Sequence, residues 1–347
     1  MNDSLRAHPA GHPSGPASGR RLARRALTLA IAACLLASCS AQAPSDSGTT
    51  PDRVDRAAKG SALSLGDSGD ARDRSSAPAQ PPREQAAPET AVESLPAVPA
   101  SRSKVALARQ LDAADATLRD QDSTRRDLQR AGEFQQLAVR TLATKPTAFR
   151  RQVTNRLRPP AAALTRNDVQ AARVLQAMTT PEHSLPTDWR IVEPPPPGEL
   201  LGYYRRAQRR TGVHWTYLAA IHLVETRMGR IRGVSSAGAH GPMQFLPSTW
   251  DIYGAGGDIN DYRDAILAAA RLLKANGAPQ DMSEALWHYN PSDYYVRAVT
   301  EHALAMQRSI SAYRGYWHWR VLYSHVRGTY VLPVGYPKKH AELVRDR

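Results

Sequence analysis

The chain has 347 residues and a formal net charge of +14, from 46 Lys and Arg against 32 Asp and Glu. This length allows one or two domains of ordinary size, and the positive charge favours nucleic acid, an anionic membrane surface or an acidic polymer as partner. The only cysteines are Cys34 and Cys39, so the rest of the chain can form no internal disulfide and no thiolate metal site.

An export signal is predicted at the N-terminus. A basic stretch at 20–25 precedes an apolar run at 26–37, which is too short to span a bilayer but suits the hydrophobic region of a signal peptide. The run ends in LASC, which resembles the lipobox of bacterial lipoproteins, where the cysteine sulfur receives a diacylglycerol. We therefore expect a lipoprotein signal peptide over 1–38 and an exported chain anchored through lipidated Cys39 to the outer face of the cytoplasmic membrane. A plain secretory signal with an incidental cysteine is the alternative.

The positive charge persists after the signal. Removing residues 1–38 takes away five arginines and one aspartate, so the mature chain keeps an excess of ten positive charges. In an exported protein this excess favours an anionic envelope polymer or a membrane surface. No nucleic-acid motif with interleaved aromatic residues is present, so no nucleic-acid partner is predicted.

Two segments of different character follow the signal. Residues 39–100 are rich in Ala, Pro, Ser, Asp and Gly and poor in apolar residues, which predicts a disordered tether. Helix formers dominate 101–192, with breaks near Pro146 and at Pro159-Pro160, so we expect two or three helices there. A helical spacer is the favoured interpretation of this segment, and a partner-binding helical hairpin is the alternative.

A mainly α-helical domain is predicted over residues 193–312. The sequence EPPPPG at 193–198 cannot continue a helix and marks the boundary. Helical patterns then alternate with Gly-rich loops. Asp261 is expected to cap a helix that ends at Asn276-Gly277, and Ser283 to cap the next one.

The last segment, 313–347, has a different pattern. Between Trp317 and Tyr336, aromatic or branched residues alternate with polar ones around Arg327-Gly328, which predicts a β-hairpin. An isolated hairpin is marginal in water, so it should pack on the helical domain. Its aromatic rings would then be structural, and stacking on sugar rings, which aromatic faces can also do, is the alternative use.

Glu225 is the first candidate for chemistry. Leu218 and Ile221 precede it by seven and four residues, so its carboxyl group should emerge along the apolar stripe of its helix. Partial desolvation would raise its pKa and let it hold a proton near neutral pH, as a general acid acting on a glycosidic oxygen requires. Taken alone, a glutamate in this setting is more often an ordinary helix-end residue.

Three ordered blocks resemble the soluble lytic transglycosylase family, in particular its actinobacterial branch. The blocks are VETRMGR, SSAGAHGPMQFLPSTW and ALWHYNPSDYYV, and the match covers about residues 200–306. The resemblance implies a lysozyme-like helical catalytic domain that cleaves the β-1,4 bond between MurNAc and GlcNAc in the glycan strands of peptidoglycan. It also implies that no cofactor is needed.

The resemblance assigns roles to matching residues. Glu225 matches the catalytic glutamate. Ser235 matches a serine near the reacting sugar, with an ordinary loop serine as the alternative. Met243 and Gln244 match a Met-Gln pair that lines the cleft, where Gln244 offers both a donor and an acceptor to the sugar. Met243 alone is more often a core residue.

A Tyr-Asn pair completes the expected site. Tyr289 and Asn290 match the family pair in which the phenol hydrogen-bonds near the catalytic carboxylate and the asparagine orients a helix junction. Thr226 replaces a serine that frequently follows the catalytic glutamate, and it keeps the hydroxyl. The loop 255–261 lacks the ligand pattern of a calcium loop, so no metal is predicted. His222 is expected to be a packed neighbour of the site.

Only Glu225 matches a catalytic acid, whereas a conventional glycosidase needs two carboxylates. The resemblance therefore implies that Glu225 protonates the leaving oxygen and then takes the proton of the sugar's own C6 hydroxyl, which gives a 1,6-anhydromuramyl end. A hydrolytic muramidase with Asp258 or Asp261 as base is one alternative. A catalytically idle peptidoglycan-binding lipoprotein is the other.

Overall fold

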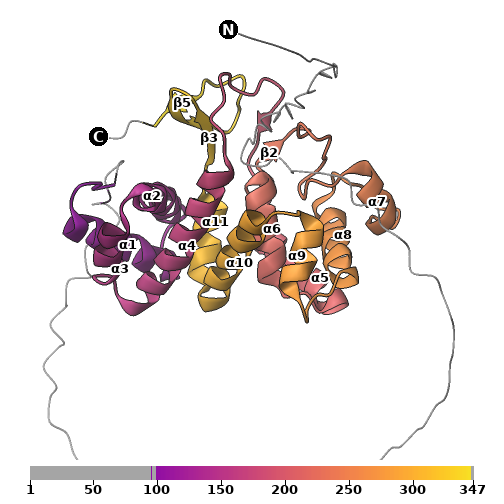
Figure 1. The fold of residues 1–347 in the computed structure, drawn as a ribbon, viewed down its shortest axis with the longest axis horizontal. Helices are drawn as coiled ribbons and strands as arrows, with labels where there is room; N and C mark the ends of the chain where they lie inside the picture. The colour runs from indigo at the N-terminus through magenta and orange to yellow at the C-terminus, as the bar shows by residue number, and fades with distance from the viewer. Residues whose placement is uncertain (1–94, 96–98, 345–347) are drawn as a thin grey trace, which may run out of the picture.

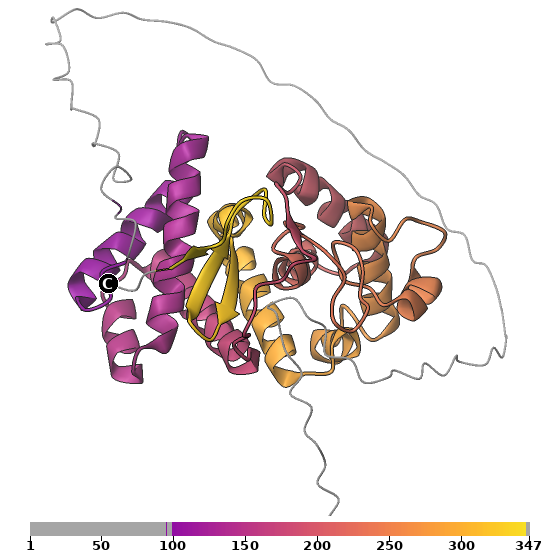
Figure 2. The same cartoon turned by 90° about the horizontal axis from the view of Figure 1, so that it is seen from above.

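The computed structural model describes residue 95 and residues 99–344. This part of the chain is mainly helical, with eleven α-helices and a small antiparallel sheet near the C-terminus (Figures 1 and 2). The predicted signal peptide, Cys39 and nearly all of the predicted tether lie outside the described residues. Among the described helices, none is long and apolar enough to cross a membrane.

The segment 101–192 forms four helices where two or three were predicted. Both predicted breaks are present, because Pro146 directly precedes the third helix and Pro159 opens the fourth. A further break follows Arg119, and the second helix then starts at a cap in which the Thr124 side chain accepts the Asp127 N–H. The helices are α1 (Lys104–Arg119), α2 (Arg125–Thr144), α3 (Thr147–Thr154) and α4 (Pro159–Met178).

Seven more helices follow the proline-rich boundary. The Asp261 side chain caps α8 by accepting the Asp264 N–H, as predicted, and Asn276 ends that helix. The predicted Ser283 cap is wrong, because Asp281 immediately precedes α9 and accepts the Glu284 N–H. The helices are α5 (Pro197–Thr211), α6 (Trp215–Thr226), α7 (Pro247–Tyr253), α8 (Tyr262–Ala275), α9 (Met282–Tyr289), α10 (Asp293–Arg308) and α11 (Ile310–His318).

The N-terminal helices pack directly on the later ones. In Figures 1 and 2, α4 runs beside α10 and α2 lies against α11, and both pairs are in contact. Leu164 of α4 belongs to the same buried core as Leu218 and Ile221 of α6. The segment 101–192 is therefore not a spacer that stands apart from residues 193–312. Sequence patterns missed this packing because it depends on contacts between helices far apart in the chain.

A buried polar cluster lies where α4, α10 and α11 meet. Asp168 is fully buried, and its Oδ1 accepts a hydrogen bond from the Tyr316 hydroxyl. His302 Nδ1 lies 3.5 Å from the same oxygen. Removing one partner of a buried polar group leaves the other unsatisfied and costs about 1–3 kcal/mol. The cluster therefore couples the N-terminal helices to the later ones.

We expect Gly132→Ala to destabilise the protein, because α2 and α11 cross closely at this residue. An added Cβ at Gly132 would lie 2.8 Å from both the Gly315 carbonyl oxygen and the His318 Cβ. Overpacking of this kind typically costs about 1–3 kcal/mol. The matched control is Gly202→Ala in α5, where nothing lies within 4 Å and alanine should stabilise the helix. Thermal unfolding measures both, and equal melting temperatures would contradict the close crossing.

Two small sheets complete the fold. Strands β1 (Arg190–Ile191) and β2 (Ile231–Arg232) pair with each other, and a second sheet has the order β3 (Val321–His325), β4 (Gly328–Leu332) and β5 (Glu342–Leu343). The β3–β4 turn at Val326-Arg327 agrees with the predicted hairpin, in which Tyr323 lies opposite Tyr330. The predicted hairpin start at 313 is wrong, because Tyr313, Tyr316 and Trp317 lie on α11 at helical spacing.

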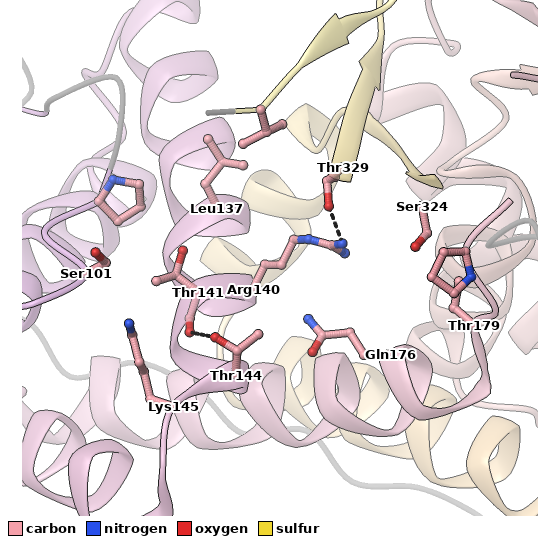
Figure 3. A pocket seen from close by; sticks show the side chains of 13 residues that line it. Ser101, Leu137, Arg140, Thr141, Thr144, Lys145, Gln176, Thr179, Ser324 and Thr329 are labelled. Atoms are coloured by element: carbon pink, nitrogen blue, oxygen red, sulfur yellow. Dashed lines mark hydrogen bonds between the residues drawn. The ribbon is translucent and has the colours of Figure 1, made fainter. Parts of the chain in front are cut away.

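The second sheet also rests on the N-terminal helices. Leu322 and Val331 pack on Leu137 of α2. Beside this contact lies a cavity of about 390 Å³ between α2, the end of α4 and the sheet (Figure 3). Polar side chains surround it, and Arg140 donates to the Thr329 hydroxyl over 2.6 Å. The first and last described segments of the chain thus lie on the same side of the molecule.

Candidate active site

The end of α6 positions Glu225. Every residue of this helix from Leu218 to Thr226 is buried, so the carboxyl group emerges into the interior of the helical core. The next three residues, Arg227, Met228 and Gly229, all have positive φ, at 55°, 60° and 86°. A Cβ at Gly229 would collide with the Tyr262 ring, so only glycine fits this last position. The chain therefore turns sharply away from Glu225 immediately after the helix.

The Glu225 side chain is held by Tyr295. The residue is 2% exposed, and the Tyr295 hydroxyl donates to its Oε1 over 2.7 Å. Tyr295 lies in the first turn of α10, where its N–H is accepted by the capping Ser292 hydroxyl. It was not among the predicted site residues, although the serine three positions earlier is a helix-start signal that places Tyr295 on a defined turn. The burial expected for the Glu225 carboxyl group is present.

Tyr289 and Asn290 lie beside this pair at the end of α9. The Tyr289 hydroxyl donates to the Met243 carbonyl oxygen over 2.6 Å, and its ring stacks parallel to that of Tyr295 at 6.2 Å between centroids. Asn290 is buried, ends α9 and accepts the Ser292 N–H through its main-chain oxygen. Asn290 thus lies at the junction between α9 and α10, and the role of its side chain there stays a prediction. Its Oδ1 is buried without a hydrogen-bond partner among the described atoms.

The loop between β2 and α7 carries the other expected residues. Ser235 Oγ accepts the N–H groups of Ala237 and Ala239 over 3.3 and 3.0 Å, so this hydroxyl stabilises the loop itself. Met243 is fully buried, in agreement with the core alternative for its side chain. Gln244 has a positive φ of 48° and donates from Nε2 to the Gly241 carbonyl oxygen over 2.9 Å. Any contact of these three residues with a sugar stays a prediction.

Thr226 joins this loop to the end of α6. Its hydroxyl donates to the Pro242 carbonyl oxygen over 2.6 Å and accepts the Gly229 N–H over 3.1 Å. Both bonds need only a hydroxyl on Cβ, which serine and threonine share. The Thr226 hydroxyl therefore holds the Pro242-Met243 backbone close to the end of α6, and a serine at this position could do the same.

Burial lowers the pKa of two residues near Glu225 in the chain, His222 and Arg227. His222 is fully buried, shares a 2.6 Å hydrogen bond with the Tyr204 hydroxyl, and has its pKa lowered by burial to about 3, so it is neutral. It is a packed neighbour of the site, as predicted. Burial also lowers the pKa of Arg227 to about 10, with smaller contributions from the charges of Arg140 and Arg230. Arg227 still remains protonated at neutral pH.

Asp258 and Asp261, the alternative candidates for a base, both form hydrogen bonds within or next to the loop before α8. Asp261 caps that helix, and Asp258 Oδ1 accepts the Asn260 N–H over 2.8 Å. Within the described part of the chain, no group of three or more His, Cys, Asp or Glu residues could hold a metal ion. The arrangement around Glu225 thus offers one buried carboxyl group and the Tyr295 phenol that donates to it. Two main-chain segments lie beside them, the turn at 227–229 and the loop that contains Met243.

Comparisons of the chain with protein-family models, with curated proteins and with solved structures find no match.

Proposed function

We propose that this protein is a peptidoglycan lytic transglycosylase with a lysozyme-like catalytic domain. The observation that carries the proposal is the buried Glu225 carboxyl group at the end of an apolar helix, held by the Tyr295 hydroxyl. The three sequence blocks that resemble the family supply Glu225, Met243 and Tyr289, and the hydrogen bond from Tyr289 to Met243 joins two of the blocks. A general acid needs such a desolvated, fixed carboxyl group.

The proposed reaction uses one carboxyl group twice. Protonated Glu225 gives its proton to the glycosidic oxygen as the C1–O bond of the muramyl residue breaks through an oxocarbenium-like state. The resulting carboxylate then takes the proton of the C6 hydroxyl, whose oxygen forms a bond to C1. The products are a free GlcNAc end and a 1,6-anhydromuramyl end, and the protonated acid is regenerated. The hydrogen bond from Tyr295 would keep Oε1 fixed in both steps.

The structural roles of Asp258 and Asp261 support attack by the sugar's own C6 hydroxyl over hydrolysis by water. A hydrolase on the same site would need a second carboxylate or another base to activate water. Asp261 is used as a helix cap and Asp258 binds a backbone N–H of its own loop, so both carboxyl groups already have structural partners. The proposed partner is therefore the peptidoglycan glycan strand, with no cofactor.

Mass spectrometry of muropeptides tests the function. The purified mature chain should release fragments from isolated sacculi that end in anhydromuramyl residues and weigh one water less than hydrolysed ones. Fragments with ordinary reducing ends would instead identify a hydrolytic muramidase. The absence of any turnover, with the protein still bound to sacculi, would leave a peptidoglycan-binding protein and refute catalysis.

We also propose that the protein is exported and anchored through lipidated Cys39. The support is the lipobox-like LASC sequence after a basic and apolar N-terminus. Cys39→Ser should move the protein from the membrane fraction to the soluble envelope fraction or the medium. Fractionation by immunoblotting measures this shift, and an unchanged membrane signal would refute lipid anchoring at Cys39.

A further inference from the structure

A cavity that is separate from the residues around Glu225 lies between α5 and α8. The two helices pack side by side (Figure 1), and the loop that follows α7 closes the cavity at one end. Its volume is about 200 Å³. Sites for drug-sized ligands usually measure about 300–1,000 Å³, so this cavity suits a small group rather than a glycan strand.

Four arginines line this cavity. Two come from α5 and two from α8, and they are Arg206, Arg210, Arg263 and Arg271. Asp264 is the one carboxylate among the lining residues. Its oxygens already accept the Arg263 Nε–H and the Asp258 N–H, each over 3.2 Å. The one carboxylate that lines the cavity is therefore already paired with groups of its own loop and helix.

The other three arginines have no carboxylate partner among the described residues. Arg271 is fixed because its Nη1 donates to the Tyr253 and Gly254 carbonyl oxygens over 2.9 and 3.3 Å. Arg206 and Arg210 are exposed, and neither makes a hydrogen bond or an ion pair with any described residue. They lie four residues apart on one face of α5, where like charges repel each other. An anion in the cavity would remove this repulsion.

We propose that this cavity binds a phosphate group. Arginine forks match the oxygens of phosphate, and guanidinium groups from two helices can bind several oxygens of one compact phosphate group, whereas a carboxylate offers only two. The phosphate is either free or carried by a phospholipid headgroup, and the latter source suits a chain tethered to a membrane. The inference does not depend on glycan cleavage at Glu225.

The test compares two double variants of the full mature chain. R206Q/R210Q removes the α5 cations that face the cavity, and R205Q/R209Q removes the same charge from exposed neighbours on the same helix. All proteins carry Cys39→Ser, so that no lipid brings them to vesicles. Calorimetric titration with inorganic phosphate and with glycerol 3-phosphate, at constant ionic strength, measures binding of the free group. Sedimentation with vesicles of phosphatidylglycerol in phosphatidylcholine measures binding of the headgroup.

We expect saturable binding that weakens about tenfold or more in R206Q/R210Q and little in R205Q/R209Q, because charged hydrogen bonds are lost only in the first variant. Binding of the soluble probes identifies a site open to free phosphate, and binding of vesicles alone identifies a headgroup site. Equal weakening in both variants would show a diffuse charge effect and overturn the proposal. Absence of binding to all three probes, or equally tight binding of acetate, would also overturn it. Equal melting temperatures show that each variant is folded.

Discussion

Glu225→Gln should leave the fold intact and remove nearly all glycan cleavage. The amide has the shape of the carboxyl group, and its oxygen can still accept the hydrogen bond from Tyr295 that holds Oε1 at 2.7 Å. It has no titrating proton to give to the glycosidic oxygen or to recover from the C6 hydroxyl. General acid–base catalysis typically contributes about 10²- to 10⁴-fold, so the rate should fall by that factor. Release of soluble muropeptides from sacculi measures it.

A glutamate on the surface of the same domain supplies the control. Glu284 lies on α9, and its side chain is 58% exposed and pairs with His288 on the next turn. Glu284→Gln makes the same chemical change away from Glu225 and should retain full activity. Both variants should melt within a few degrees of the wild type. If Glu225→Gln kept more than about a tenth of the activity, Glu225 would not be the general acid.

Ending the chain after Ala312 should abolish folding. The deletion removes most of α11 and with it four large aromatic residues that lie in the main core, Tyr313, Tyr316, Trp317 and Trp319. Burying one large apolar side chain contributes about 1.5–3 kcal/mol. The combined loss is comparable to the whole folding free energy of a typical domain, about 5–15 kcal/mol. Soluble expression and circular dichroism measure the outcome.

A second truncation, ending after Arg320, isolates the role of the sheet. It keeps α11 and removes β3, β4 and β5, which cover Trp189 and Ile191. We expect a folded chain with a lower melting temperature. If the shorter chain that ends after Ala312 melted normally but bound long glycan strands weakly, the aromatic residues would act on sugar rings and their structural assignment would be wrong.

Local signals in the sequence predicted several helix boundaries correctly. Pro146, Pro159 and Asp261 act through the backbone of their own neighbours, and each starts a helix where expected. The turn of the C-terminal hairpin was also predicted from local alternation. Trp317 was misassigned because a short run of aromatic residues fits both a strand and one turn of a helix. The wrong Ser283 cap has a similar origin, since Asp281 lies only two positions earlier.

The candidate site was predictable only in part. The position of Glu225 on an apolar helix follows from spacing within α6, and its 2% exposure agrees with that expectation. Its partner Tyr295 lies 70 residues later, and no local pattern specifies that contact. The same limit applies to the Asp168 and Tyr316 pair, which are 148 residues apart. Long-range pairing depends on how whole helices pack, and propensity and periodicity do not encode it.

The packing of α4 against α10 limits how far the proposed active site can lie from the bilayer. A free-standing helical stalk would hold the enzyme at a fixed height above a lipid attached to Cys39. Because the N-terminal helices are part of the same folded body as Glu225, they add no such height. About 65 residues separate Cys39 from the start of α1, and a chain of that length spans at most about 220 Å when fully extended. If Cys39 carries the lipid and Glu225 cleaves the glycan strands, as proposed, the number of residues between Cys39 and α1 sets the greatest distance from the membrane at which cleavage can occur. Shortening residues 40–94 should then confine cleavage to the layers nearest the membrane.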